Sequence, residues 1–136
     1  MPLRLLELAE ISDAASAKSA LSDSVLCYCD FASINIDGAH VDSLLQNCSF
    51  TAVEWYWALF NCATLIECTF SQCTFRGVSF MGCTFVKCTF KDCHFLDDNL
   101  GGVCTMSHSE LFACEVHGCV GWEEMATSQS HARGGA

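Results

Sequence analysis

Residues 67–100 read ECTF-SQCTF-RGVSF-MGCTF-VKCTF-KDCHF-LDDNL, and this stretch decides the fold. A large apolar residue recurs every five positions from Phe70 to Leu100, and a small residue stands two positions before nearly all of them. A spacing of five matches neither the 3.6-residue turn of an α-helix nor the simple alternation of a strand. It predicts a chain that turns a corner every five residues, with the large and the small side chain both pointing inward.

The same pattern extends in both directions from this stretch. Toward the N-terminus it runs back to Leu45, skips one residue and resumes from Val41 back to Leu21, and toward the C-terminus it gains one residue after Leu100 and ends at Val116. Five, twelve and three repeats make twenty. Four repeats close one coil, and coils stack at roughly 4.8 Å. We therefore predict an all-β fold, a right-handed quadrilateral parallel β-helix of about five coils with short terminal caps.

This repeat divides the chain into three parts. The β-helix is predicted to span residues 19–121, behind an N-terminal cap over residues 1–18 and ahead of a C-terminal cap and disordered tail over residues 122–136. The N-terminal part leaves two alternatives, because it fits a short capping helix but Ile11, with Ala9, also fits an early coil. At the other end, residues 122–125 are expected to cover the strand edges of the last coil.

Both inward positions of the repeat predict core residues. The large central side chains are expected to stack on their equivalents one coil away, and they are Phe50, Phe60, Leu65, Phe70, Phe75, Phe80, Phe85, Phe90, Phe95 and Leu100. The small side chains are expected at the corners, where nothing bulky fits, and they are Cys48, Cys68, Cys73, Val78, Cys83, Cys88, Cys93, Cys104 and Cys114.

Two interruptions of the spacing predict local irregularities. We expect a tightened corner between Val41 and Leu45 and a bulge between Leu100 and Met106. The reason is that the central residues before and after each interruption must both point into the core. Asp98 occupies a small inward position, where an unpaired carboxylate is costly, so it should accept backbone hydrogen bonds or turn toward solvent. On this register, replacement of Asp98 by alanine is expected to be neutral or stabilising.

The repeats resemble those of the pentapeptide repeat family, whose consensus is A(D/N)LXX. The resemblance covers about Ser19 to Cys119 and departs from the consensus mainly in placing cysteine where alanine is usual. Cysteine is a small apolar residue that suits the same position. The resemblance implies the β-helix, whereas it implies little about function, because members of the family do different things.

The cysteines are predicted to be structural. Ten of the twelve stand at the small inward position, dispersed over four walls rather than clustered as zinc ligands are. Stacked pairs such as Cys68 and Cys88 approach the separation that a disulfide spans, but a reduced state is expected in a cytosolic protein. Cys27 and Cys62 lie off the inward position, so they are the expected reactive pair. No metal and no cofactor is predicted.

Composition and charge argue against nucleic-acid binding, membrane binding and catalysis as functions of this chain. The net charge of −10 disfavours direct binding to nucleic acid or to an anionic membrane, because such binding depends on lysine and arginine. No apolar run approaches the roughly 18–20 residues that span a bilayer, and Glu7 and Glu10 interrupt the short apolar N-terminus. No nucleophile–base pair is apparent. A cytoplasmic, non-enzymatic protein is predicted.

Exposed aromatic residues favour a protein-binding surface. Tyr56 and Trp57 are expected to point outward beside Arg76, and aromatic and arginine side chains dominate interface energetics. We expect the Trp57 indole to lie across Gly77 with one face open, and Tyr56 to make a cation–π contact with Arg76. The alternative is that Trp57 merely covers a neighbouring coil. The partner is predicted to be another protein, in an immunity or protection role, and an open coil end also offers a surface for a homodimer.

The second functional hypothesis is mimicry of DNA. Family members that protect DNA gyrase from quinolones resemble a rod of B-DNA, and the resemblance makes gyrase or another topoisomerase the alternative partner. One wall is expected to carry Asp37, Glu54, Asp97 and Glu115, interrupted by Arg76. This charge is sparse beside the roughly one charge per 1.7 Å of duplex DNA, and no projecting loop is evident.

Overall fold

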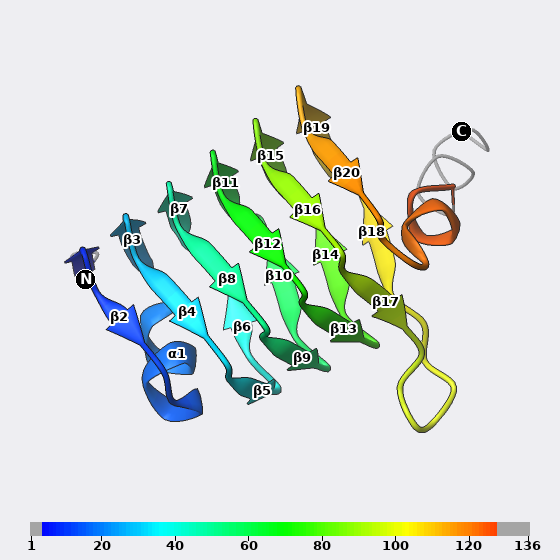
Figure 1. Ribbon diagram of the computed structural model, residues 1–136, viewed down its shortest axis with the longest axis horizontal. Helices are drawn as coiled ribbons and strands as arrows, with labels where there is room; N and C mark the ends of the chain where they lie inside the picture. Colours follow the sequence, from blue (N-terminus) through cyan, green and yellow to red (C-terminus); the bar gives the residue numbers. More distant parts are fainter. Residues whose placement is uncertain (1–3, 128–136) are drawn as a thin grey trace.

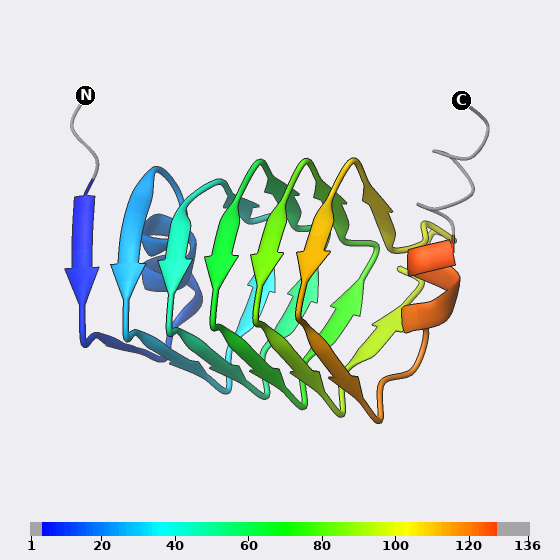
Figure 2. The ribbon, with the colours of Figure 1, turned by 90° about the horizontal axis from the view of Figure 1, so that it is seen from above.

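The computed structural model describes residues 4–127, which form a four-walled parallel β-helix (Figure 1, Figure 2). Wall 1 contains β1 (Arg4–Glu7), β3 (Ser24–Cys27), β7 (Leu44–Gln46), β11 (Thr64–Ile66), β15 (Thr84–Val86) and β19 (Glu110–Phe112). Wall 2 contains β2 (Glu10–Ile11), β4 (Asp30–Ala32), β8 (Ser49–Thr51), β12 (Thr69–Ser71), β16 (Thr89–Lys91) and β20 (Glu115–His117). Wall 3 contains β5 (Asn35–Asp37), β9 (Glu54–Tyr56), β13 (Thr74–Arg76) and β17 (His94–Leu96). Wall 4 contains β6 (His40–Val41), β10 (Leu59–Asn61), β14 (Ser79–Met81) and β18 (Thr105–Ser107).

The corners between the walls share one backbone device. The residue two positions after the central one adopts a left-handed conformation, as at Trp57 with φ 56° and Gly77 with φ 59°. The corner between Val41 and Leu45 is one residue shorter than the others and lacks the left-handed residue, since none of the residues there has a positive φ. The hydroxyl of Ser43 instead donates to the Leu21 carbonyl at 2.7 Å. The tightened corner predicted at this point is confirmed.

The core consists of stacked central side chains. On wall 2, the rings of Phe31, Phe50, Phe70 and Phe90 lie nearly parallel, with successive centroids 4.6, 4.7 and 4.9 Å apart. Of the predicted central residues, nine are buried, and they are Phe50, Phe60, Leu65, Phe70, Phe75, Phe80, Phe85, Phe90 and Phe95. The predicted small residues are likewise buried from Cys48 to Cys104, and Cys114 in the last coil is half-buried.

Leu100 is the predicted core residue that the structure contradicts. Its side chain is 81% exposed, and the place expected for it on wall 4 belongs to Met106, which pairs with Phe80. The chain therefore gains six residues between Phe80 and Met106, which are separated by 26 positions instead of 20. The six extra residues and the usual corner residue form a loop, Asp97–Val103, that projects beyond β17 in Figure 1, rather than a one-residue bulge. The helix regains its register only at Cys104.

The N-terminal part is an early coil and not a capping helix of residues 1–18. Strands β1 and β2 pair with β3 and β4, so the coil begins by Arg4. A helix, α1 (Ala14–Ala20), then replaces walls 3 and 4 of this coil, and Asp13 caps it by accepting from the Ser16 N–H at 2.8 Å. The predicted boundary at residue 19 falls inside α1. The repeat predicted at Leu21 is the C-cap of this helix rather than a strand.

The C-terminal end of the core is covered as predicted. Residues 122–127 are helical, and the Trp122 ring lies 5.0 Å from that of Phe90 and 5.5 Å from that of Phe95. Met125 is buried beside them. The disordered tail predicted beyond this cap lies outside the described residues. Walls 1 and 2 thus end in half coils on both sides, each completed by a helix (Figure 2).

Candidate protein-binding site

The loop Asp97–Val103 is fastened to the β-helix by one carboxylate. Asp98 Oδ1 accepts hydrogen bonds from the backbone N–H groups of Leu100 at 2.8 Å and Gly102 at 2.7 Å. Its other oxygen, Oδ2, accepts from the indole Nε1 of Trp57 at 2.6 Å. The prediction that Asp98 finds backbone donors is therefore confirmed. The expectation that alanine there would be harmless loses its basis, because Asp98 stands in the loop and not at a small inward position.

A second anchor lies beside the first. The Tyr56 hydroxyl donates to Oδ1 of Asn99 and accepts from the Asn99 N–H at 3.0 Å. The rings of Tyr56 and Trp57 meet edge to face with centroids 4.4 Å apart. Two adjacent residues of β9 and its corner thus hold two adjacent residues of a loop that lies more than forty positions later in the sequence.

The side chain nearest to Gly77 is that of Asp98 and not that of Trp57, which was predicted to lie there. The carboxylate of Asp98 occupies that space, since a Cβ at Gly77 would be 2.7 Å from Asp98 Oδ2. The absence of a side chain at Gly77 is what lets the loop approach the wall. Trp57 remains 44% exposed, so its indole bonds to the loop at one edge while much of the side chain stays open to water.

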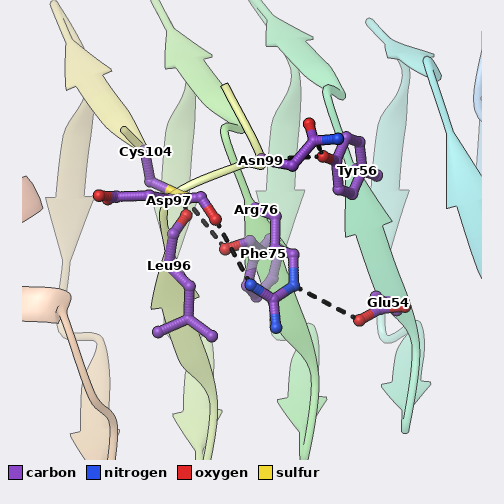
Figure 3. A network of polar contacts seen from close by, with 8 residues as sticks. All are labelled: Glu54, Tyr56, Phe75, Arg76, Leu96, Asp97, Asn99 and Cys104. Carbon is purple, nitrogen blue, oxygen red and sulfur yellow. Dashed lines mark hydrogen bonds and ion pairs between the residues drawn. The ribbon is translucent and has the colours of Figure 1, made fainter. Parts of the chain in front are cut away.

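Arg76 bonds to groups other than those predicted for it. Its Nε lies 3.7 Å from Glu54 Oε2, and one terminal nitrogen donates to the Asp97 carbonyl at 3.4 Å, as Figure 3 shows. The expected cation–π partner, Tyr56, is instead bonded to Asn99 in the same view. Arg76 therefore helps to hold the start of the loop. Because both ends of the Arg76–Glu54 pair are partly exposed, the pair itself contributes little to stability.

A groove of about 580 Å³ runs between the loop and the C-terminal helix. Its lining combines apolar and charged residues, which are Arg76, Phe95, Leu96, Asp97, Val103, Cys104, Gly121 and Glu124. Leu100 is exposed at the tip of the loop, outside this groove, and Val103, which lines the groove, is also exposed. The loop thus carries two exposed apolar side chains, and one of them, Val103, lines a groove that also contains two carboxylates and one guanidinium.

The predicted acidic wall is only partly assembled. Asp37 and Glu54 lie on wall 3 and Asp97 follows its last strand, but Glu115 lies on wall 2 in β20. The misplacement has the same cause as that of Leu100, since the extra residues of the loop move every later repeat by one wall. Arg76 neutralises Glu54 in the middle of this surface. The wall therefore presents a mixed rather than a uniformly negative face.

Other expectations concern metals, cysteines and membranes. Among residues 4–127, no group of three or more histidine, cysteine or acidic side chains is arranged to hold a metal ion. All twelve cysteines are free, with Cys62 exposed and Cys27 half-buried. Within the same residues, each helix is too short or too polar to cross a bilayer.

The hydrogen bond from Trp57, followed by that from the Gly102 N–H, lowers the pKa of Asp98 below its ordinary value. A lowered pKa in the folded state stabilises the fastened loop above the ordinary value of about 3.9. This stabilisation is lost as the pH falls through the lower pKa of the folded state. We expect the Trp57 indole N–H resonance to shift in that acidic range and not near pH 4 or above. An Asp98→Asn variant should lack the transition, and an indole titration at the ordinary pKa would contradict this account.

Comparison with known proteins agrees with the fold. Residues 50–97 match the family model described as pentapeptide repeats (9 copies). This part of the chain is therefore built of pentapeptide repeats. It resembles the crystal structure of the pentapeptide repeat protein Rfr23 from the cyanobacterium Cyanothece 51142, with a TM-score of 0.59 and 12% identity over 86% of this chain and 87% of that one. A structure of QnrB1, a plasmid-mediated fluoroquinolone resistance protein, aligns over 97% of this chain and 96% of that one at 10% identity, but its TM-score of 0.23 supports no inference. No curated protein matches the sequence.

Proposed function

We propose that this chain is a non-catalytic protein-binding module whose contact surface is the loop Asp97–Val103 together with Tyr56 and Trp57. The observation that carries the proposal is Leu100, which is 81% exposed at a loop whose Asp98 accepts two hydrogen bonds from the loop backbone and one from Trp57 of the β-helix. A large apolar side chain on a restrained loop backbone loses less backbone entropy on binding than one on a mobile loop, and such preorganisation favours affinity.

The charges beside Leu100 indicate the partner's chemistry. Asp97 and Glu124 line the groove next to the loop and outnumber its one cationic residue, Arg76, and the chain as a whole carries a net charge of −10. A complementary surface would present an apolar pocket for Leu100 flanked by basic side chains, because charge complementarity steers association and sets specificity. We therefore expect a basic protein surface as the partner, in a cytoplasmic setting. A homodimer through the open edge of a half coil stays a separate prediction.

Two matched variants test the proposed surface. Leu8 is 78% exposed at the corner after β1, at the opposite end of the β-helix from the loop, so Leu8→Ala removes the same side chain at similar exposure. We expect affinity capture with immobilised protein to retain a specific partner with wild type and Leu8→Ala, and to lose it with Leu100→Ala. The purified partner should bind Leu100→Ala roughly tenfold more weakly, or about 1.4 kcal/mol. Equal binding by all three proteins would refute the loop as the contact surface.

Mimicry of DNA, with DNA gyrase as partner, has the weaker support. The surface on which it depends contains the Arg76–Glu54 pair and lacks Glu115. A gyrase supercoiling assay separates the two hypotheses. Inhibition by wild type and by Leu100→Ala alike would favour the mimic, because its action would rest on the carboxylates rather than on the loop tip.

A further inference from the structure

Cysteines of successive coils stack in two columns inside the β-helix. In each column the residue after one cysteine donates its N–H to the carbonyl of the cysteine one coil earlier, as Glu115 does to Cys88 and Val120 does to Cys93, both at 2.9 Å. The longer column contains Cys29, Cys48, Cys68, Cys88 and Cys114, and the shorter contains Cys73, Cys93 and Cys119. Thiols of neighbouring coils therefore lie side by side in register.

The surroundings of these thiols favour an uncharged disulfide over a charged, metal-bound thiolate. Cys88 Sγ lies 3.3 Å from the Leu65 carbonyl oxygen, and Cys114 Sγ lies 3.5 Å from that of Phe85. Carbonyl oxygens stabilise a thiol and oppose a thiolate, so a buried thiolate holding a metal ion would be unfavourable here. A disulfide carries no charge and needs no donor. Neighbouring coils lie roughly 4.8 Å apart, which falls within the roughly 4.4–6.8 Å that the Cα atoms of a disulfide span.

One pair combines access to solvent with a position outside the contacts of the C-terminal cap. Forming the bond requires two stacked sulfurs to approach each other, and inner coils resist because they are packed on both sides. Cys114 belongs to the last half coil and is half-buried, while its neighbour Cys88 is buried. Cys119 is also half-buried, but the cap holds the chain after it, since the backbone N–H of Phe95 donates to the Val120 carbonyl at 2.8 Å and Trp122 covers Phe95.

We propose that Cys114 and Cys88 form an oxidation site that takes a low-molecular-weight disulfide such as oxidised glutathione. The thiolate of Cys114 attacks one sulfur of oxidised glutathione, giving a mixed disulfide and one glutathione thiolate. The thiolate of Cys88 then attacks the Cys114 sulfur of the mixed disulfide and releases the second glutathione. Both cysteines lose their protons, the protein loses two electrons in all, and oxidised glutathione becomes two molecules of glutathione. Because burial raises the pKa of the Cys114 thiol, the first step should accelerate as the pH rises.

The products separate cleanly by proteolysis. Cleavage after lysine and glutamate places Cys88 in residues 88–91 and Cys114 in residues 111–115, whereas Cys93 and Cys119 fall in other peptides. The folded protein would be incubated with oxidised glutathione, alkylated, digested and analysed by mass spectrometry. We expect a linked pair of peptides 88–91 and 111–115, removed by reductant, and a raised melting temperature in the linked form.

Matched variants decide the outcome. Cys114→Ser should abolish the linked product, while Cys119→Ser should leave its yield unchanged. Cys62→Ser should also leave it unchanged, which excludes a route through the exposed cysteine. A link between Cys93 and Cys119, glutathione attached only at Cys62, or no modification of Cys114 would each overturn the proposal.

Discussion

Phe70→Ala is expected to lower the free energy of unfolding by about 3–5 kcal/mol, the usual cost of deleting a fully buried ring. Phe70 lies in the middle of its column, with ring centroids 4.7 Å from Phe50 and 4.9 Å from Phe90. Its side chain is fully buried. The truncation removes contacts with the coil on either side, and the rigid corners prevent the walls from closing over the cavity.

Denaturant unfolding followed by circular dichroism measures this loss. Thr69→Ala is the control, because Thr69 is the exposed neighbour in the same strand and should change stability by no more than about 0.5 kcal/mol. A loss below about 1 kcal/mol for Phe70→Ala would mean that the column does not hold the coils together.

Gly121→Ala is expected to detach the C-terminal cap. Gly121 has φ 84°, and a Cβ there would overlap the backbone carbonyl oxygen of Phe95. The chain must move away from Phe95, and Trp122 then leaves the rings of Phe90 and Phe95. The open end of the core becomes exposed to water.

Gly38→Ala is the control that has the same backbone strain as Gly121→Ala but lacks the steric clash of the new Cβ. Gly38 also has a left-handed φ of 74°, but nothing lies within 4 Å of a Cβ built on it. This variant should lose only the roughly 1–2 kcal/mol that a left-handed conformation costs other residues. We expect Gly121→Ala to melt at a clearly lower temperature and to bind a hydrophobic dye. Equal melting temperatures for the two variants would contradict the close approach at Phe95.

The sequence predicted the walls and the core because a spacing of five leaves one way to bury both inward positions. It failed at Asp98 and Leu100, which imitate a small and a large residue at the correct separation. The local sequence did indicate a turn instead of a repeat. Asp98 followed by Gly101 and Gly102 is typical of a turn in which a carboxylate accepts hydrogen bonds from nearby backbone N–H groups. Counting the loop as one repeat plus one residue moved Glu115 to the wrong wall.

The site was less predictable than the fold. Tyr56 and Trp57 stand out as exposed aromatics, but their hydrogen bonds run to Asp98 and Asn99 in a loop that the periodicity concealed. At the N-terminus the spacing of Leu6, Ile11 and Leu21 fits one continuous phase. There the polar residue Ser16 interrupts the repeat, and α1 takes the place of two walls.

The most direct test of the proposed contact surface is photo-cross-linking from position 100. A photoreactive phenylalanine analogue would replace Leu100 in one protein and Leu8 in a control, each incubated with the captured partner. We predict a covalent adduct from position 100 and none from position 8, with the adduct from position 100 much reduced when Trp57→Ala releases the loop. Equal adducts from positions 8 and 100, or an adduct from position 100 that Trp57→Ala leaves unchanged, would contradict a binding surface built on the fastened loop.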